Sequence, residues 1–173
     1  MLELEESNVG RILIIGNTGA GKSWLSARLG AVMGVTPTPM DAIFWKPGGY
    51  IERREGHEIE AIISECLSQE HWLVEGVFGE IADRFLYRTD LLVYLAPPIA
   101  YCLNNLSNRF YTNVEQALKT DQVALLAWAS EYNDRESKTS KKYHEKLYSD
   151  FNGKKVKLTT EQEISEFSRE FRC

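Results

Sequence analysis

The feature that most constrains this 173-residue chain is an eight-residue stretch near its beginning. It directly follows an apolar run at residues 11–15 and directly precedes an amphipathic helical pattern. It matches G-x-x-x-x-G-K-[ST] at every position, as Gly16, Asn17, Thr18, Gly19, Ala20, Gly21, Lys22 and Ser23. Glycines let a backbone curl so that successive N–H groups face one concavity. The stretch therefore predicts a strand, a tight loop and a helix in immediate succession.

This loop has the chemistry needed to hold phosphates. Curled N–H groups and the positive end of the following helix meet at one point. Lys22 would supply a full charge to the outer phosphates, and the Ser23 hydroxyl is the group that completes a magnesium shell. We predict that ATP and Mg²⁺ bind at residues 16–24, with Trp24 included. The alternative is a glycine-rich turn that only permits close packing, but chance rarely supplies every motif position in this context.

Alternation of apolar runs with helical patterns predicts the rest of the fold. Strands are expected at residues 11–15, 72–77, 90–96 and 155–159, with a weaker one at 39–44. The clearest helical face carries Ile59, Ile62, Ile63, Cys66 and Leu67, and the helix after the loop is expected to end at Gly34. Continuous Ile/Leu/Val runs indicate a parallel sheet covered on both faces, so we predict a three-layer α/β fold in one domain over residues 1–173.

Two segments interrupt this alternation and are expected to be functional insertions. Residues 45–56 are rich in turn-forming Pro and Gly and predict an exposed loop. Residues 109–148 are helical in pattern and charged, and they contain no strand candidate. Because they fall between the fourth and fifth strands, we predict a lid there.

Composition excludes several classes of protein. A net charge of −5 argues against direct binding of nucleic acid through many phosphate contacts. Cys66, Cys102 and Cys173 lack the spacing of a disulfide framework or a zinc site. The acidic start of the chain does not match a signal peptide, and no apolar run has the length of a membrane span. We therefore expect a cytoplasmic protein with no membrane association, and the sequence indicates no particular oligomeric state.

Beyond the loop, the sequence resembles adenylate-kinase-like P-loop proteins, and among them the small bacterial proteins called DNA topology modulation proteins. The stretch that carries this likeness is Met40-Asp41-Ala42-Ile43-Phe44-Trp45-Lys46-Pro47-Gly48, which is similar to that group's Leu-Asp-x-x-x-Trp-x-Pro-Gly. Residues 72–76 and 90–97 are similar to its third and fourth strands. The likeness covers about the first 110 residues.

The resemblance implies a five-stranded sheet in adenylate-kinase order, an acceptor beside the second and third strands, and lid arginines that close on the phosphates. Glu75 and Gly76 stand where adenylate kinases have Asp-Gly, so Glu75 would order magnesium-bound water. Arg109 and Arg135 stand at the start and end of the lid's first part and would neutralise charge on the transferring phosphoryl group. Val77-Phe78 replaces the Pro-Arg of adenylate kinases, which argues against AMP as the acceptor.

Further candidates each have a plainer interpretation. Asp41 follows a short strand and would receive an acceptor hydroxyl or bind a base, or it caps a turn. Trp45 would stack on an acceptor ring, or it packs against Phe44. Arg84 is a weaker substrate-binding candidate, with a surface position as its alternative. The histidines at 57, 71 and 144 lack ligand spacing and are expected to have surface or capping roles.

Two main functional hypotheses follow. The first is a kinase that transfers the γ-phosphoryl group of ATP to a small acceptor, such as a nucleoside monophosphate or a comparable hydroxyl or phosphate compound. The second is a nucleotide-binding regulator of the DNA topology modulation type with little or no turnover. A GTPase is less well supported, because no Asn-Lys-x-Asp stretch is present to read guanine.

Overall fold

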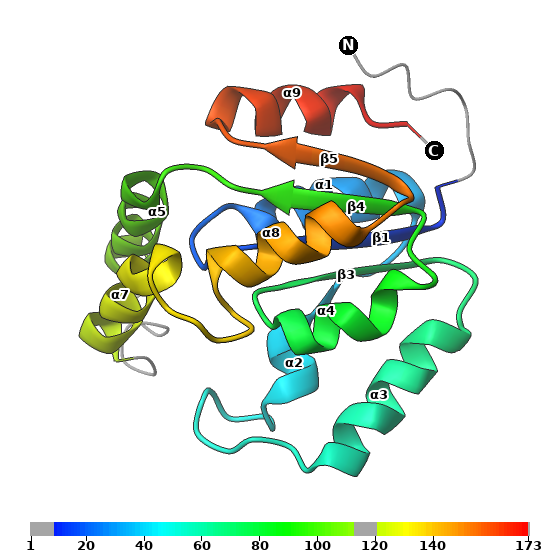
Figure 1. Ribbon diagram of the computed structural model, residues 1–173, viewed down its shortest axis with the longest axis horizontal. Helices are drawn as coiled ribbons and strands as arrows, with labels where there is room; N and C mark the ends of the chain where they lie inside the picture. The colour runs from blue at the N-terminus through cyan, green and yellow to red at the C-terminus, as the bar shows by residue number, and fades with distance from the viewer. Residues whose placement is uncertain (1–8, 113–120, 173) are drawn as a thin grey trace.

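A parallel sheet of five strands organises the chain (Figure 1). The computed structural model describes residues 9–112 and 121–172. The strands are β1 (Arg11–Gly16), β2 (Thr38–Pro39), β3 (Trp72–Gly76), β4 (Leu91–Leu95) and β5 (Lys154–Leu158). The helices are α1 (Lys22–Met33), α2 (Met40–Phe44), α3 (Gly56–Ser68), α4 (Gly79–Leu86), α5 (Ile99–Thr112), α7 (Gln122–Ser130), α8 (Lys141–Asp150) and α9 (Glu161–Glu170), with a 3-10 turn η1 (Glu131–Asn133).

The strand order is β2-β3-β1-β4-β5, with every pairing parallel. This is the adenylate-kinase order that the sequence predicted, and the α/β fold class is confirmed. β1 lies at the centre because its apolar residues are buried on both faces and must pair on both edges. Since all strands are parallel, their carboxyl ends lie along one edge of the sheet, and the loop that was predicted to bind phosphates follows β1 there.

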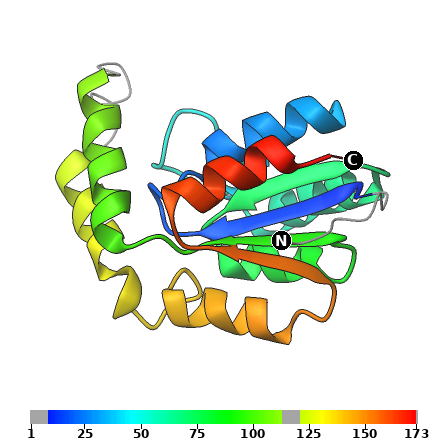
Figure 2. The same ribbon diagram turned by 90° about the horizontal axis from the view of Figure 1, so that it is seen from above.

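Helices cover both faces of the sheet, as the continuous apolar strands require. Ile12 and Ile14 pack toward α1 and α9, whereas Leu13 and Ile15 pack toward α2, α3, α4 and α8. Figure 2 shows α1 and α9 on one side of the strands and α4 and α8 on the other. The expected three-layer arrangement is therefore present.

The predicted strand at residues 39–44 is wrong for most of its length. Only Thr38 and Pro39 pair with β3, and the chain then turns into the short helix α2. Proline lacks an N–H for the sheet ladder and belongs on an edge strand. Met40 and Ile43, three residues apart, are both fully buried, which is the spacing of a helix face and not of a strand.

The expected lid at residues 109–148 includes a part that belongs to the core. α8 packs on the sheet, and its Leu147 is 2% exposed among the side chains of β4 and α4. α5 and α7 instead pack on each other around Leu106, Phe110 and Ala129, beyond the carboxyl ends of the strands (Figure 1). Residues 113–120 lie outside the described residues. α7 and the outer part of α5 therefore stand apart from the sheet, whereas Cys102 of α5 belongs to the core with α1 and α9. α8 lies in one of the helical layers of the main fold.

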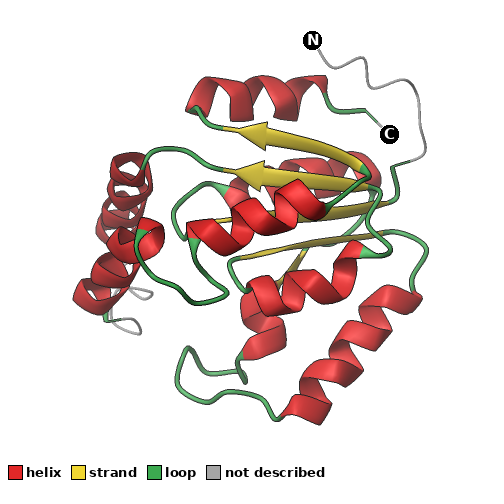
Figure 3. Cartoon of the chain, in the orientation of Figure 1, coloured by secondary structure: helices red, strands yellow, loops and turns green. Residues whose placement is uncertain are grey.

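The predicted helix cap and the predicted loop both agree with the structure. α1 is followed by Gly34 in the left-handed conformation, as a helix C-cap requires. Residues 45–55 form a loop that is pinned by one antiparallel bridge between Trp45 and Arg53. Figure 3 shows how this loop separates α2 from α3. Cys66 and Cys102 are free thiols, and none of the described helices is long and apolar enough to cross a membrane.

His144 corrects the expectation of a surface histidine, because it is fully buried. Its Nδ1 lies 2.6 Å from the Tyr132 hydroxyl, and its Nε2 lies 3.0 Å from the backbone oxygen of Val77. The Tyr94 hydroxyl extends the network, 3.2 Å from that of Tyr132. Burial lowers the pKa of His144 to about 3, so the ring is neutral, donating from Nε2 and accepting at Nδ1. The network joins α8, η1 and β4 with the end of β3.

The burial of Leu147 predicts that α8 supports the whole fold. Leu147→Ala should lower the free energy of unfolding by about 2–5 kcal/mol, because it removes buried methyl groups and leaves a cavity. Urea denaturation followed by circular dichroism measures this change. Val123→Ala on α7, where the side chain is 79% exposed, is the matched control and should stay within about 0.5 kcal/mol. If Leu147→Ala lowered the free energy of unfolding as little as Val123→Ala does, α8 would have to be assigned to the lid instead of the core.

The neutral His144 predicts an acid-sensitive contribution to stability. The unfolded chain binds a proton at this ring below about pH 6.5, while the folded chain does so only near 3. Stability from this residue is therefore complete above about pH 6.5 and is lost as the pH falls from there toward 3. His144→Gln, which cannot titrate, should lose stability less steeply between pH 7 and 5, whereas exposed His71→Gln should follow the wild type. If the stability of His144→Gln and of the wild type fell equally steeply with pH, His144 would not be the source of the acid sensitivity.

Candidate functional site

The loop between β1 and α1 is a tight concave turn. Gly19 and Gly21 have φ values of 77° and 97°, which L-residues with side chains rarely adopt. A Cβ at Gly19 would also lie 2.3 Å from the backbone oxygen of Cys102, so α5 packs directly on the loop. Asn105 of α5 donates from Nδ2 to the Gly19 oxygen at 3.0 Å. α5 therefore fixes the shape of this loop.

Lys22 is placed at the floor of the loop. Its side chain is buried, and Nζ donates to the backbone oxygen of Asn17 at 2.8 Å. Burial lowers the pKa of Lys22, against the opposing pull of the Glu75 and Asp41 carboxylates. A lysine held this way delivers its charge at a fixed point, where a bound phosphate would replace part of its lost hydration.

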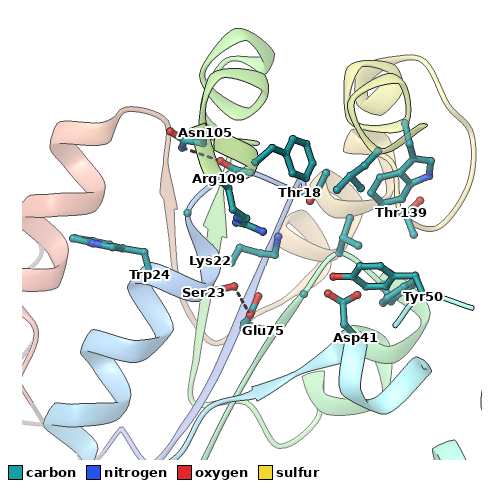
Figure 4. Close-up of a pocket in the computed structure, with 18 of the residues that line it drawn as sticks. Thr18, Lys22, Ser23, Trp24, Asp41, Tyr50, Glu75, Asn105, Arg109 and Thr139 are labelled. Atoms are coloured by element: carbon teal, nitrogen blue, oxygen red, sulfur yellow. Dashed lines mark hydrogen bonds between the residues drawn. The ribbon is translucent and has the colours of Figure 1, made fainter. Parts of the chain in front are cut away.

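Ser23 and Glu75 meet across the sheet edge. The Ser23 hydroxyl donates to Glu75 Oε1 at 2.8 Å, and Glu75 is 5% exposed near the end of β3 (Figure 4). A hydroxyl and a carboxylate are oxygen ligands, and Mg²⁺ commonly uses one or two of these with phosphate and water. No cluster of three His, Cys, Asp or Glu side chains able to hold a metal occurs among the described residues.

One large cleft, about 1400 Å³ in volume, runs across this edge. Figure 4 shows Trp24 and Asn105 on one side of Lys22, and Asp41, Tyr50 and Thr139 on the other. We call these the Trp24 side and the Asp41 side. The predicted residues that line the cleft are Thr18, Gly19, Gly21, Lys22, Ser23, Trp24, Asp41, Trp45, Glu75, Gly76 and Arg109. The fold thus gathers most of the predicted site into a single space with room on both sides of the loop.

Asp41 enters the cleft from the first turn of α2. The carboxylate faces the open cleft, yet the surrounding protein raises its pKa, chiefly by desolvation, with Lys22 acting in the opposite direction. Tyr50 lies above it, and desolvation followed by the Asp41 charge raises the pKa of that phenol. Trp45 is half-buried, so it both packs on Phe44 and contributes to the cleft wall.

The two predicted arginines occupy different positions. Arg109, on α5, lines the cleft and points toward Lys22 (Figure 4). Arg135 lies behind the loop, where its guanidinium stacks 3.8 Å from the Trp128 ring centroid and reaches Asn17 Oδ1 at 3.4 Å. Its Nε and Nη1 are buried and have no hydrogen-bond partner among the described residues. Both arginines thus lie beside the loop, and Arg135 retains unused donors.

The structure does not bring Arg84 into the cleft. Its guanidinium forms two hydrogen bonds with Glu60, at 2.8 and 2.7 Å, on the exposed surface between α4 and α3. The last turn of α4 directs this side chain toward α3, so its expected role in substrate binding has no support in the geometry. Asn17 and Ala20 contribute to the loop without lining the cleft.

Sequence reasoning missed several residues that line the cleft, among them Tyr50, Asn105 and Thr139. Tyr50 belongs to the loop predicted after Trp45, and its place just behind Gly48 and Gly49 is a usable signal because that turn folds the chain back over α2. Asn105 and Thr139 carried no signal. Their positions depend on how α5 and the segment before α8 pack at the sheet edge.

Comparisons with known proteins support the fold. No protein-family model and no curated protein sequence matches this chain. Solved structures do match, and three of them are 17%, 16% and 13% identical to this chain. The gluconokinase of Sinorhizobium meliloti 1021 has a TM-score of 0.53 and 17% identity, with 94% of this chain and 89% of that chain covered. The shikimate kinase of Acinetobacter baumannii has a TM-score of 0.56 and 16% identity, with 94% of this chain and 90% of that chain covered.

A deoxyadenosine kinase of M. mycoides, solved with bound dATP, has a TM-score of 0.52 and 13% identity, covering 92% of this chain and 98% of that one. At these identities the likeness establishes the fold and not the reaction. This chain has the fold of small P-loop kinases, a five-stranded parallel sheet in the order 2-3-1-4-5.

Proposed function

We propose that this protein is an ATP- and Mg²⁺-dependent phosphotransferase that moves the γ-phosphoryl group to a small acceptor. One observation carries the proposal most directly. The phosphate-binding loop and Asp41 share one cleft, with Lys22 between its two sides. A donor on the Trp24 side and an acceptor on the Asp41 side would meet at Lys22.

The residues present suit the nucleotide and the cation. The curled backbone at residues 16–21 offers N–H groups to phosphates, and Lys22 lies at its floor. Ser23 and Glu75 would hold Mg²⁺ directly and through water, respectively. When bound, Mg²⁺ neutralises charge on the β- and γ-phosphate oxygens. The unused donors of Arg135, next to Asn17, are consistent with a phosphate partner.

Catalysis by this chain would consist of positioning and charge neutralisation. Lys22 and Arg109 face the same region of the cleft and would offset charge that grows on the phosphoryl oxygens. α7 stands over the cleft and packs mainly on α5. Such an element opens at low cost, so we propose it as the lid that excludes water.

A regulator without turnover would need only the Trp24 side of the cleft, where the nucleotide would bind. The Asp41 side, with a carboxylate and aromatic walls, has no purpose in that alternative. This favours the transferase over a regulator of the DNA topology modulation type.

Lys22→Ala tests the loop itself. Removing the charge on the outer phosphates should lower ATP affinity or turnover at least tenfold, about 1.4 kcal/mol or more. Isothermal titration with MgATP and a coupled assay of ADP formation measure the two quantities. Melting of the variant should remain close to the wild type, since the loop shape depends on the glycines and α5. Unchanged binding and turnover in a folded variant would contradict the assignment.

The arginines provide a second test. Arg109→Ala and Arg135→Ala should reduce kcat by at least tenfold while the Kd for ATP changes less, because the charge they offset is greatest in the transition state. Arg84→Ala is the matched control, since that arginine pairs with Glu60 away from the cleft. It should leave both constants unchanged. A loss with Arg84→Ala equal to that of the other two would show that the effect is general and not local.

A further inference from the structure

The Asp41 side of the cleft has a distinct aromatic lining. Phe44 and Phe78 stack with centroids 4.3 Å apart and ring planes within 11° of parallel. The Trp45 ring meets the Phe44 ring edge-on, with ring centroids 4.8 Å apart, and the ring centroids of Tyr50 and Trp45 are 6.2 Å apart. All four residues line the cleft and none is fully buried. Part of each ring surface is therefore exposed and available to a flat partner.

The charged residues around the Asp41 side of the cleft also restrict which acceptors can bind there. Among the described residues that line the cleft, Lys22 and Arg109 are the only basic ones, and both face the transfer position. Asp41 is the acidic residue beside the aromatic walls. A phosphate or carboxylate of the acceptor beside Asp41 would add a second negative charge there, while Lys22 and Arg109 would already face the phosphates of ATP. Burying such an unpaired charge is costly.

Basic residues nearby do not change this balance. Lys46 Nζ is 2.6 Å from Glu52, and Arg54 Nε donates to the Ala42 oxygen. Arg53 lies over the outer side of the Phe44 ring at 4.7 Å, near Glu80. None of these three side chains lines the cleft. The loop after α2 therefore carries its cations outward and its aromatic rings inward.

We infer that the acceptor is an uncharged hydroxyl compound with a flat ring, of the nucleoside class, and that Asp41 receives the proton of its hydroxyl. This inference rests on the proposed function and narrows it, because nucleoside monophosphates are then poor acceptors. The ring lies against the aromatic walls, and the hydroxyl points to the space between Asp41 and Lys22.

The chemical step balances without a further reactant. The acceptor oxygen forms a bond to the γ-phosphorus as the bond from that phosphorus to the β–γ bridging oxygen breaks. The electron pair of the broken bond leaves with ADP. The hydroxyl proton passes to the Asp41 carboxylate and then to water. Desolvation raises the pKa of Asp41, which makes the carboxylate a better proton acceptor than one in water.

The experiment is a coupled assay of ADP formation with a matched panel of acceptors. It contains the four common ribonucleosides, the four deoxynucleosides, each corresponding 5′-monophosphate, and gluconate and shikimate as acidic compounds without an aromatic ring. At least one nucleoside should be accepted, with kcat/KM at least tenfold above that of its own monophosphate. Separate titration with MgATP establishes that the donor binds.

Asp41→Asn keeps the shape of the side chain and removes its basicity. With the preferred nucleoside, kcat should fall by about 100-fold or more, while the Kd for MgATP changes less than twofold. The control is Asp150→Asn on α8, where the carboxylate pairs with Lys146 at the surface. It should leave both constants unchanged. An Asp41→Asn variant with full activity would overturn the role of Asp41.

The outcomes separate this inference from the proposed function. A monophosphate, gluconate or shikimate preferred over every nucleoside would overturn the acceptor class and leave the kinase in place. If MgATP binds but no acceptor raises ADP formation above the rate in water, the kinase proposal falls and the acceptor class with it.

Discussion

The structure depends on the burial of β1 between two parallel neighbours. Because the side chains of Ile12 to Ile15 are fully buried, the strand has to pair on both edges and be covered on both faces. Parallel pairing with β3 and β4 brings the carboxyl ends of all three strands to one edge. The loop that begins at Gly16 and the Glu75 carboxylate therefore meet there. Ser23, at the end of this loop, contacts Glu75 although the two residues are 52 positions apart in the sequence. Ligand sites of open parallel sheets lie at such edges for this reason.

Local patterns were sufficient for the parts of the chain whose form is set by nearby residues. The loop, β1, β3, β4, the face of α3 and the Gly34 cap all follow from spacing, and the structure has them where expected. The failures have a common cause. The stretch from Pro39 to Phe44 is too short for its periodicity to distinguish a strand from a helix. It forms a helix because this places both Met40 and Ile43 in the core. His144 gave no warning, because its burial depends on Tyr132 and Val77, which are distant in sequence.

The same distinction applies to the site. The loop residues and Glu75 were predictable because a motif or a strand end identifies them. Asn105 and Thr139 were not, since each reaches the cleft through the packing of α5 or of the segment before α8. Arg84 illustrates the reverse case: it was a weaker substrate-binding candidate in the sequence, but the last turn of α4 directs it to Glu60 on the surface. A charged residue identifies a site only when the direction of its helix face is also known.

Asn17 is the point where the loop meets the α7 region, and this contact has an energetic consequence. Its Nδ2 donates to the Ala129 oxygen at 3.0 Å, its Oδ1 accepts from the Thr18 amide at 2.9 Å, and Arg135 approaches the same oxygen. Arg135 in turn stacks on Trp128, a wall of the cleft. The Asn17 side chain thereby links the loop to α7 and, through Arg135, to the Trp128 ring in the cleft wall. Cooperativity between two ligands is reciprocal, so the factor by which one compound tightens the binding of the other is the same in both directions.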